Sequence, residues 1–500
     1  MKKRLIALFL ALILLGAHGA SAAPLDFSGG VNNEYQYEEY VFITGEPIKF
    51  VGTYDVSEKE KDAEKTVTYN FKLEPEDKSL DAKLERRITL VTTYTQRSDK
   101  GQTTAQTELT KYRETLKIGS DRYELEDFQL SQSDVIDNRP ASDFYSGNMR
   151  GRKYYKINRN EGEVLVEIMG GNVGYENFWG STDTLQLEYR ITSKREMQVE
   201  DEEDETEDVS WSGTVQIQVS DSRTKTVRYS DNEANFSSFY GGYIRITNQE
   251  MVSRYEYNLP RMSDDGIPND KKRNRGTLQL RKEMVPKLER LTIPKFRDVG
   301  GHWAENAINQ LYALDIFEEQ SAFFLPDTPI TRAEFIKAVI RACNIRTTTV
   351  EEKTRQSRRK TQPEVSPFVD VAVTDPNYLY IKDALQKGII SGVSSNQFAP
   401  NKPLTKAEAI TILIRALGFE SKAPTPGYYT AFADDRNIPN WAKDSVYVAR
   451  EIGLVSGDSY NRFYPTKNLT KAETASLLIR FLEFLQADLQ RDYRENIINY

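Results

Sequence analysis

Apolar and polar residues alternate along the chain from about residue 24 to 290, as in strands that have one buried face. The segments with this pattern are rich in β-branched and aromatic residues and lie at 66–73, 87–96, 163–169, 185–191, 213–219 and 242–248. Turn-forming residues separate them at 98–102, 158–163 and 221–225. The pattern predicts a large, mostly antiparallel β domain, or two smaller domains that share a sheet.

After about residue 290 the apolar residues recur at helical spacing, and the sequence repeats itself three times. Each copy opens with Phe-x-Asp, continues through an amphipathic segment to an aromatic-x-Pro element, and closes with a second helical segment. The closing segments are PDTPITRAEFIKAVIRA (326–342), PNKPLTKAEAITILIRA (400–416) and PTKNLTKAETASLLIRF (465–481). Because these anchors align in all three copies, we predict three related helical units.

Each closing helix starts with a threonine that is followed three residues later by a glutamate. This spacing predicts a capping box, in which the two side chains satisfy backbone amides at the start of the helix. The pairs are Thr331 with Glu334, Thr405 with Glu408, and Thr470 with Glu473. The threonine and the glutamate therefore have a structural explanation.

The basic residue after each threonine does not have such an explanation. Arg332, Lys406 and Lys471 stand in the first helical turn, where the helix dipole makes a cation unfavourable. A cation beside free helix-start amides would be favourable if an anion bound in front of it. A solvated surface charge is the alternative, but the same position is basic in all three copies.

These motifs together resemble the S-layer homology domain over about 290–485. The shared elements are Phe-x-Asp, a Trp-Ala helix start, Gly-(Ile/Leu)-(Ile/Val)-Ser-Gly, aromatic-x-Pro and (Ile/Leu)-Thr-(Arg/Lys)-Ala-Glu. The resemblance implies a multidomain chain, with the β domain followed by an all-α, pseudo-threefold unit of three repeats. It also implies non-covalent binding to secondary cell wall polysaccharide that carries acidic, pyruvylated amino sugars.

The family's groove uses the opening aspartate, a tryptophan, a turn glycine and the basic residue of the capping motif. By resemblance these are Asp298, Trp303 and Arg332 in the first repeat, Asp370, Gly392 and Lys406 in the second, and Asp434, Trp441, Gly457 and Lys471 in the third. The first repeat has Asp315 and Glu319 in place of two turn glycines, and the second has Pro376 in place of tryptophan. We therefore expect the third groove to be the most complete.

The first 22 residues have a basic start, an apolar run and a small-residue cleavage site, which predict a signal peptide and export. The expected organisation is a signal peptide (1–22), a β-rich domain (23–289), repeats at 290–345, 367–420 and 429–485, a polar insert (346–366) and a C-terminal tail (486–500). No later run is apolar enough to span a membrane, so we expect no membrane insertion after cleavage.

Composition narrows the chemistry. The net charge of −8 argues against nucleic acid as a partner. Cys343 is the single cysteine, so no internal disulfide can form, and we expect it to be buried. After signal cleavage His302 is the single histidine, so we expect no metal site, and nothing in the sequence points to a cofactor.

Three functions fit this sequence. The leading interpretation is a protein anchored to the cell wall or S-layer surface by its repeats, with the β domain as a structural or interaction module. The first alternative is a wall-displayed enzyme that acts on polysaccharide, because glycoside hydrolysis needs only two carboxylates. The sequence does not locate such a pair. The second alternative is an envelope spacer or lattice subunit, which differs from the leading interpretation only in self-association.

Overall fold

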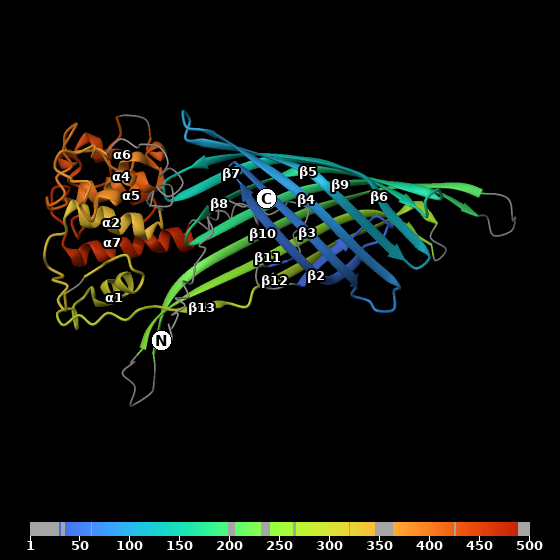
Figure 1. The fold of residues 1–500 in the computed structure, drawn as a ribbon, viewed down its shortest axis with the longest axis horizontal. Coiled ribbons are helices and arrows are strands. Elements are labelled where there is room, and N and C mark those ends of the chain that lie inside the picture. The colour runs from blue at the N-terminus through green and yellow to red at the C-terminus, as the bar shows by residue number, and fades with distance from the viewer. Residues whose placement is uncertain are drawn as a thin grey trace, which may run out of the picture.

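The computed structural model describes residues 30–31, 36–61, 63–198, 206–231, 241–263, 267–319, 321–345, 364–424 and 427–488. The predicted signal peptide, nearly all of the polar insert and most of the C-terminal tail lie outside these residues. A long curved sheet forms the N-terminal part, and the helices gather at one end of it (Figure 1).

The N-terminal part is an antiparallel sheet of thirteen strands. The strands are β1 (Gln36–Val41), β2 (Ile48–Lys61), β3 (Glu64–Pro75), β4 (Ala82–Arg97), β5 (Gln102–Ile118), β6 (Asp121–Asn138), β7 (Ser142–Ile157), β8 (Gly162–Asn177), β9 (Gly180–Gln198), β10 (Thr206–Asp231), β11 (Gly241–Met262), β12 (Pro268–Glu283) and β13 (Lys287–Arg290). From β1 to β12 each strand pairs with the next in sequence, and β13 pairs with β11.

All six segments that were predicted as strands lie inside observed strands, so the antiparallel β domain is confirmed. The turns predicted at 98–102 and 158–163 separate β4 from β5 and β7 from β8. The turn predicted at 221–225 is wrong. These residues lie within β10, where all five pair with β11 and residues 221–224 also pair with β9, so the segment is part of the sheet.

The sheet curls until its first strand reaches its last ones. Lys282 of β12 pairs with Glu38 of β1 at 2.5 Å, and the rings of Tyr40 and Tyr255 lie 5.4 Å apart in an edge-to-face arrangement. One continuous apolar core fills the inner face, with Phe50, Leu84 and others fully buried. The alternating pattern of the sequence therefore distinguishes the inner face of the roll from its outer face.

A charged cluster crosses this interior. The guanidinium of buried Arg86 donates to Glu114 at 2.6 Å and to Glu39 at 2.9 Å, and the Tyr155 hydroxyl donates to Glu114 at 2.9 Å. Burial raises the pKa of Glu114, but Arg86 and then Lys153 outweigh burial and hold it at about 2. Both carboxylates are therefore held by the same cation, as buried charges require.

Three further carboxylates, on β6, β9 and β10, line the inner face closer to the helices. Asp183 pairs directly with Asp221 in the sheet. One side-chain oxygen each of Asp134 and Asp183 is shielded from solvent and has no hydrogen-bond partner among the described residues. Burial, followed by the charges of Asp221 and Asp134, raises the pKa of Asp183 to about 8, and burial raises that of Asp134 to about 6.

The C-terminal part is helical. Its described α-helices are α1 (Glu305–Ala313), α2 (Arg332–Ala342), α4 (Tyr378–Gln386), α5 (Lys406–Leu417), α6 (Asn440–Glu451) and α7 (Lys471–Glu483). Two short 3-10 helices, η1 (Glu420–Lys422) and η2 (Asp435–Asn437), and a π-helical segment, η3 (Phe484–Asp488), complete it. All three predicted capping boxes are present, at α2, α5 and α7. The region also contains three isolated β-bridges, so it is helical without being purely α.

The hydrophobic core of the helical region extends onto the end of the sheet. Trp179, between β8 and β9, is 1% exposed and packs with the helical region, as do Ala141 and Tyr175. The Trp179 indole donates to the carbonyl of Ala342 at 2.7 Å, and the Ala141 amide donates to the carbonyl of Ala416 at 2.9 Å. The sheet therefore packs directly against the helices.

Replacing Trp179 with alanine should destabilise the helical region by about 3–5 kcal/mol, because a large buried side chain and its hydrogen bond are lost together. The midpoint of urea unfolding, followed by the helical circular dichroism signal, measures the change. Trp303→Ala is the matched control, because Trp303 is 65% exposed and should cost about 0.5 kcal/mol or less. Equal shifts for the two variants would contradict a docked junction.

The raised pKa of Asp183 predicts a dependence of stability on pH. Between about pH 4 and 8 the folded protein keeps the proton that the unfolded chain releases, so stability should fall as pH rises through this window. Asp183→Asn should remove most of that fall, which unfolding curves at pH 5 and pH 8 would reveal. Asp99→Asn, on an exposed hairpin, serves as the control. An unchanged pH dependence in the Asp183 variant would show that this carboxyl is ionised in the fold.

Candidate groove site between the repeats

The three repeats are joined by a closed ring of backbone hydrogen bonds. The amide of Ile330 donates to Leu469 at 3.0 Å, the amide of Leu404 donates to Ile330 at 3.0 Å, and the amide of Leu469 donates to Leu404 at 2.9 Å. All three residues are buried. Each repeat thus contacts both of the others through the residue before its capping threonine.

A second set of bonds runs in one direction around this ring. The first two amides of α2 donate to carbonyls of the second repeat, those of α5 to the third, and those of α7 to the first. For α7, the amides of Lys471 and Ala472 reach Thr328 and Pro326, each at 2.9 Å. The expectation of free helix-start amides is therefore wrong, because neighbouring repeats already satisfy them.

The basic side chains follow the same direction. Arg332 lies over the ring of Phe398 in the second repeat, with the guanidinium 4.9 Å from the ring centre. Three matching cation–π contacts result, since Lys406 lies 4.7 Å from Phe463 and Lys471 lies 5.4 Å from Phe324. Each groove therefore combines one repeat's aromatic and aspartate with the cation of the preceding repeat.

The aspartate that opens each repeat holds the aromatic-x-Pro element in place. Asp298 accepts the amides of Phe324 and Leu325 at 2.9 and 2.7 Å, and Asp370 and Asp434 do the same in their repeats. Leu325 adopts a left-handed conformation (φ 59°), which these bonds stabilise. Burial raises the pKa of Asp298, but the two amides, then Lys471, outweigh burial and hold it below its usual value.

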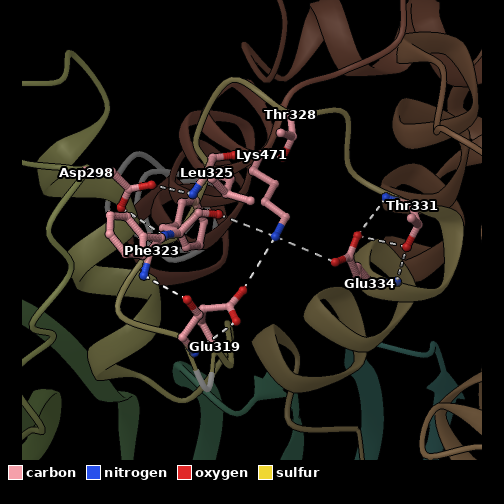
Figure 2. Close-up of polar contacts among 10 residues, drawn as sticks. Asp298, Glu319, Phe323, Leu325, Thr328, Thr331, Glu334 and Lys471 are labelled. Carbon is pink, nitrogen blue, oxygen red and sulfur yellow. Dashed lines mark hydrogen bonds and ion pairs between the residues drawn. The ribbon is translucent and has the colours of Figure 1, made fainter.

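We name the grooves by the repeat that supplies the aspartate. The first groove contains Asp298, exposed Trp303 and Lys471. The Lys471 ammonium contacts the Phe324 carbonyl at 3.4 Å. It lies 3.6 Å from Glu319 and 3.7 Å from Glu334, and Figure 2 shows it between these two carboxylates. Two carboxylates of the first repeat therefore face its cation.

The second groove contains Asp370, Gly392 and Arg332. Its guanidinium is buried and donates to the carbonyl of Phe398 at 3.0 Å and to Glu408 at 3.0 Å. Burial lowers the pKa of Arg332, and Glu408 opposes that effect. The Arg332 guanidinium is therefore already bound by groups of the second repeat.

The third groove contains Asp434, half-exposed Trp441, Gly457 and Lys406. No ion pair to Lys406 is formed by any carboxylate of the described residues, because the capping glutamate of this repeat, Glu473, pairs with Lys467 instead. Burial, then the neighbouring Lys467, lowers the pKa of Lys406. Among the described residues, Arg332 and Lys471 each have a carboxylate partner, whereas half-buried Lys406 has none.

The structure thus corrects the composition expected for the grooves. Lys471 was expected beside Asp434, Trp441 and Gly457, but its contacts among the described residues lie on the first repeat. The site residues expected from the sequence also did not include the phenylalanine under each cation, which is Phe398, Phe463 or Phe324. The aromatic-x-Pro element recurs in all three copies, and that recurrence could have pointed to it.

Other candidate chemistry is limited in the described residues. Cys343 is buried, as expected, and burial raises the pKa of its thiol. Within the described ranges, no three His, Cys, Asp or Glu side chains are arranged to hold a metal ion. None of the helices in that part of the chain is both long and apolar enough to cross a membrane.

Comparison of the sequence with known protein families also finds three repeats in the C-terminal part. The S-layer homology domain matches residues 295–336, 367–410 and 431–475. The C-terminal part of the chain therefore carries three S-layer homology domains, and the predicted resemblance is confirmed. The matched residues begin at 295, so they do not include the N-terminal sheet.

Several relatives share part of this sequence. An amylopullulanase of Thermoanaerobacterium thermosulfurigenes is 31% identical over 191 residues, which are 38% of this chain and 9% of that protein. An endoglucanase of a Bacillus species is 33% identical over 135 residues, which are 26% of this chain and 14% of that protein. A surface-layer 125 kDa protein of Lysinibacillus sphaericus is 28% identical over 208 residues, which are 41% of this chain and 16% of that protein. The chain spans less than a fifth of the length of each. The three domains and the surface-layer relative indicate a location at the cell wall or cell surface.

Proposed function

We propose that this protein is held on the cell wall without a covalent bond, and that its S-layer homology domains bind an acidic, pyruvylated wall polysaccharide. The β domain, docked on the anchor through Trp179, serves as a displayed structural or interaction module. The surface-layer relative supports the anchoring role. The observation that carries the binding site is that the Lys406 ammonium, in the third groove, forms no ion pair with a carboxylate of the described residues.

The third groove offers what an acidic sugar requires. Lys406 supplies a partly desolvated cation, which interacts with a carboxylate more strongly than a solvated one. Trp441, 53% exposed, supplies an apolar face for a sugar ring. Asp434 and Gly457 complete the set of residues that the family's groove uses.

We also propose that the three repeats form a pseudo-threefold unit with boundaries near 290–345, 367–420 and 429–485. The closed ring of Ile330, Leu404 and Leu469 supports this arrangement. In it, the first groove, with Asp298 and Trp303, and the second, with Asp370 and Gly392, are not occupied by the acidic sugar. Their cations, Lys471 and Arg332, already have carboxylate partners.

A catalytic role for the β domain is the second candidate, because two of the relatives are named as an amylopullulanase and an endoglucanase. A cavity of about 70 Å³ inside the roll is lined by Tyr40, Tyr189, Glu39 and Glu114, among others. Glycoside hydrolysis needs a carboxylic acid whose pKa is raised. Arg86 holds both of these carboxylates, and the pKa of Glu114 is lowered, so the cavity favours a structural role.

Lys406→Ala should weaken binding of the full mature chain to purified wall polymer by about 10- to 100-fold, because a charge-assisted contact contributes about 1.5–3 kcal/mol. Lys471→Ala, at the same position of the capping motif, is the matched control and should change binding little. Titration calorimetry measures both.

Polymer stripped of its pyruvyl groups provides the second control. Wild type and Lys406→Ala should then bind equally weakly, since no carboxylate remains to pair with the lysine. Unchanged binding of Lys406→Ala to intact polymer, or an equal loss in Lys471→Ala, would contradict the assignment to the third groove.

A further inference from the structure

The first groove carries a side chain where the other two have glycine. In the second and third repeats the corresponding positions are Gly392 and Gly457. A Cβ atom at Gly392 would lie 2.2 Å from the carbonyl oxygen of Ser394, and one at Gly457 would lie 2.6 Å from Asn461. These two loops therefore exclude a side chain, whereas the loop of the first repeat accommodates Glu319.

Glu319 points at the cation of its groove. Its Oε2 atom lies 3.6 Å from the Lys471 ammonium (Figure 2). Its Oε1 atom accepts a hydrogen bond from the amide of Ser321 at 3.2 Å, which orients the carboxylate. Glu319 belongs to the same chain as Lys471, so its carboxylate has a high effective concentration at the ammonium and competes well with a free acidic sugar. Both partners are also largely shielded, with side-chain exposures of 25% and 17%.

The rest of the first groove resembles the third. Trp303 is exposed, Asp298 binds the aromatic-x-Pro amides, and Lys471 lies over the Phe324 ring. Glu334 also approaches Lys471, at 3.7 Å, but it belongs to the capping box and its side chain is 45% exposed. A capping glutamate occurs in every repeat, whereas Glu319 is present in the first repeat alone.

We propose that the Glu319 carboxylate takes the place beside Lys471 that the ligand's carboxylate would occupy. It thereby keeps the first groove closed to acidic sugars and leaves the third groove as the binding site. This inference rests on the proposed function, because it concerns the same class of ligand. Glu319 thereby acts as the residue that decides which groove is occupied. Removing its charge leaves Lys471 near the half-exposed capping Glu334 alone among the described carboxylates, and makes a second groove available.

Glu319→Gln tests this directly, because it removes the charge and keeps the size of the side chain. Titration calorimetry of the full mature chain with a pyruvylated amino-sugar disaccharide should give one site per chain for wild type and two for Glu319→Gln. Adding Lys471→Ala to Glu319→Gln should return the number to one. Glu319→Asp, which keeps the charge, is the matched control and should stay at one site.

The outcomes separate this inference from the proposed function. One site in both wild type and Glu319→Gln overturns the inference and leaves anchoring through the third groove intact. Two sites in wild type that fall to one in Lys471→Ala also overturn it, because the first groove would then be open with Glu319 in place. Binding by neither protein overturns the proposed function and this inference together.

Discussion

Three backbone hydrogen bonds, from Ile330 to Leu469, from Leu404 to Ile330 and from Leu469 to Leu404, tie the repeats into a ring on which the rest of the helical region depends. Each bond adds about 1 kcal/mol, but breaking one inside the core would leave buried polar groups without partners at a further cost of about 1–3 kcal/mol. The ring also sets the direction in which helix-start amides and basic side chains cross to the next repeat. No repeat therefore contains a complete groove by itself.

Shared grooves explain how three similar sequences produce three different sites. The cation always comes from the preceding repeat, whereas the carboxylates that compete for it come from the repeat it enters. Lys471 meets Glu319, Arg332 meets Glu408, and Lys406 enters a repeat whose capping glutamate is held by Lys467. Small differences between copies thus decide charge balance at the groove, while the apolar core and the caps stay the same.

The alternation in the β half predicted the strands, because period-two burial follows directly from strand geometry. The capping boxes were predicted because they depend on residues three positions apart. The partner of each basic residue was not predicted, since ring closure between residues more than sixty positions apart decides it. Polar residues of β10 such as Asp221 and Ser222 misled the prediction at 221–225, because buried polar strands and turns have similar compositions. Trp179 gave no signal of its role, since its partners lie in another domain.

Native-state hydrogen exchange of the Ile330, Leu404 and Leu469 amides tests most directly whether the three repeats form one closed unit. If they do, the three amides open together, with the same free energy of opening and the same dependence on denaturant. Opening of one amide at clearly lower free energy than the other two would show that a repeat detaches on its own. In that case the grooves could not depend on a closed ring, and the account given for them would be contradicted.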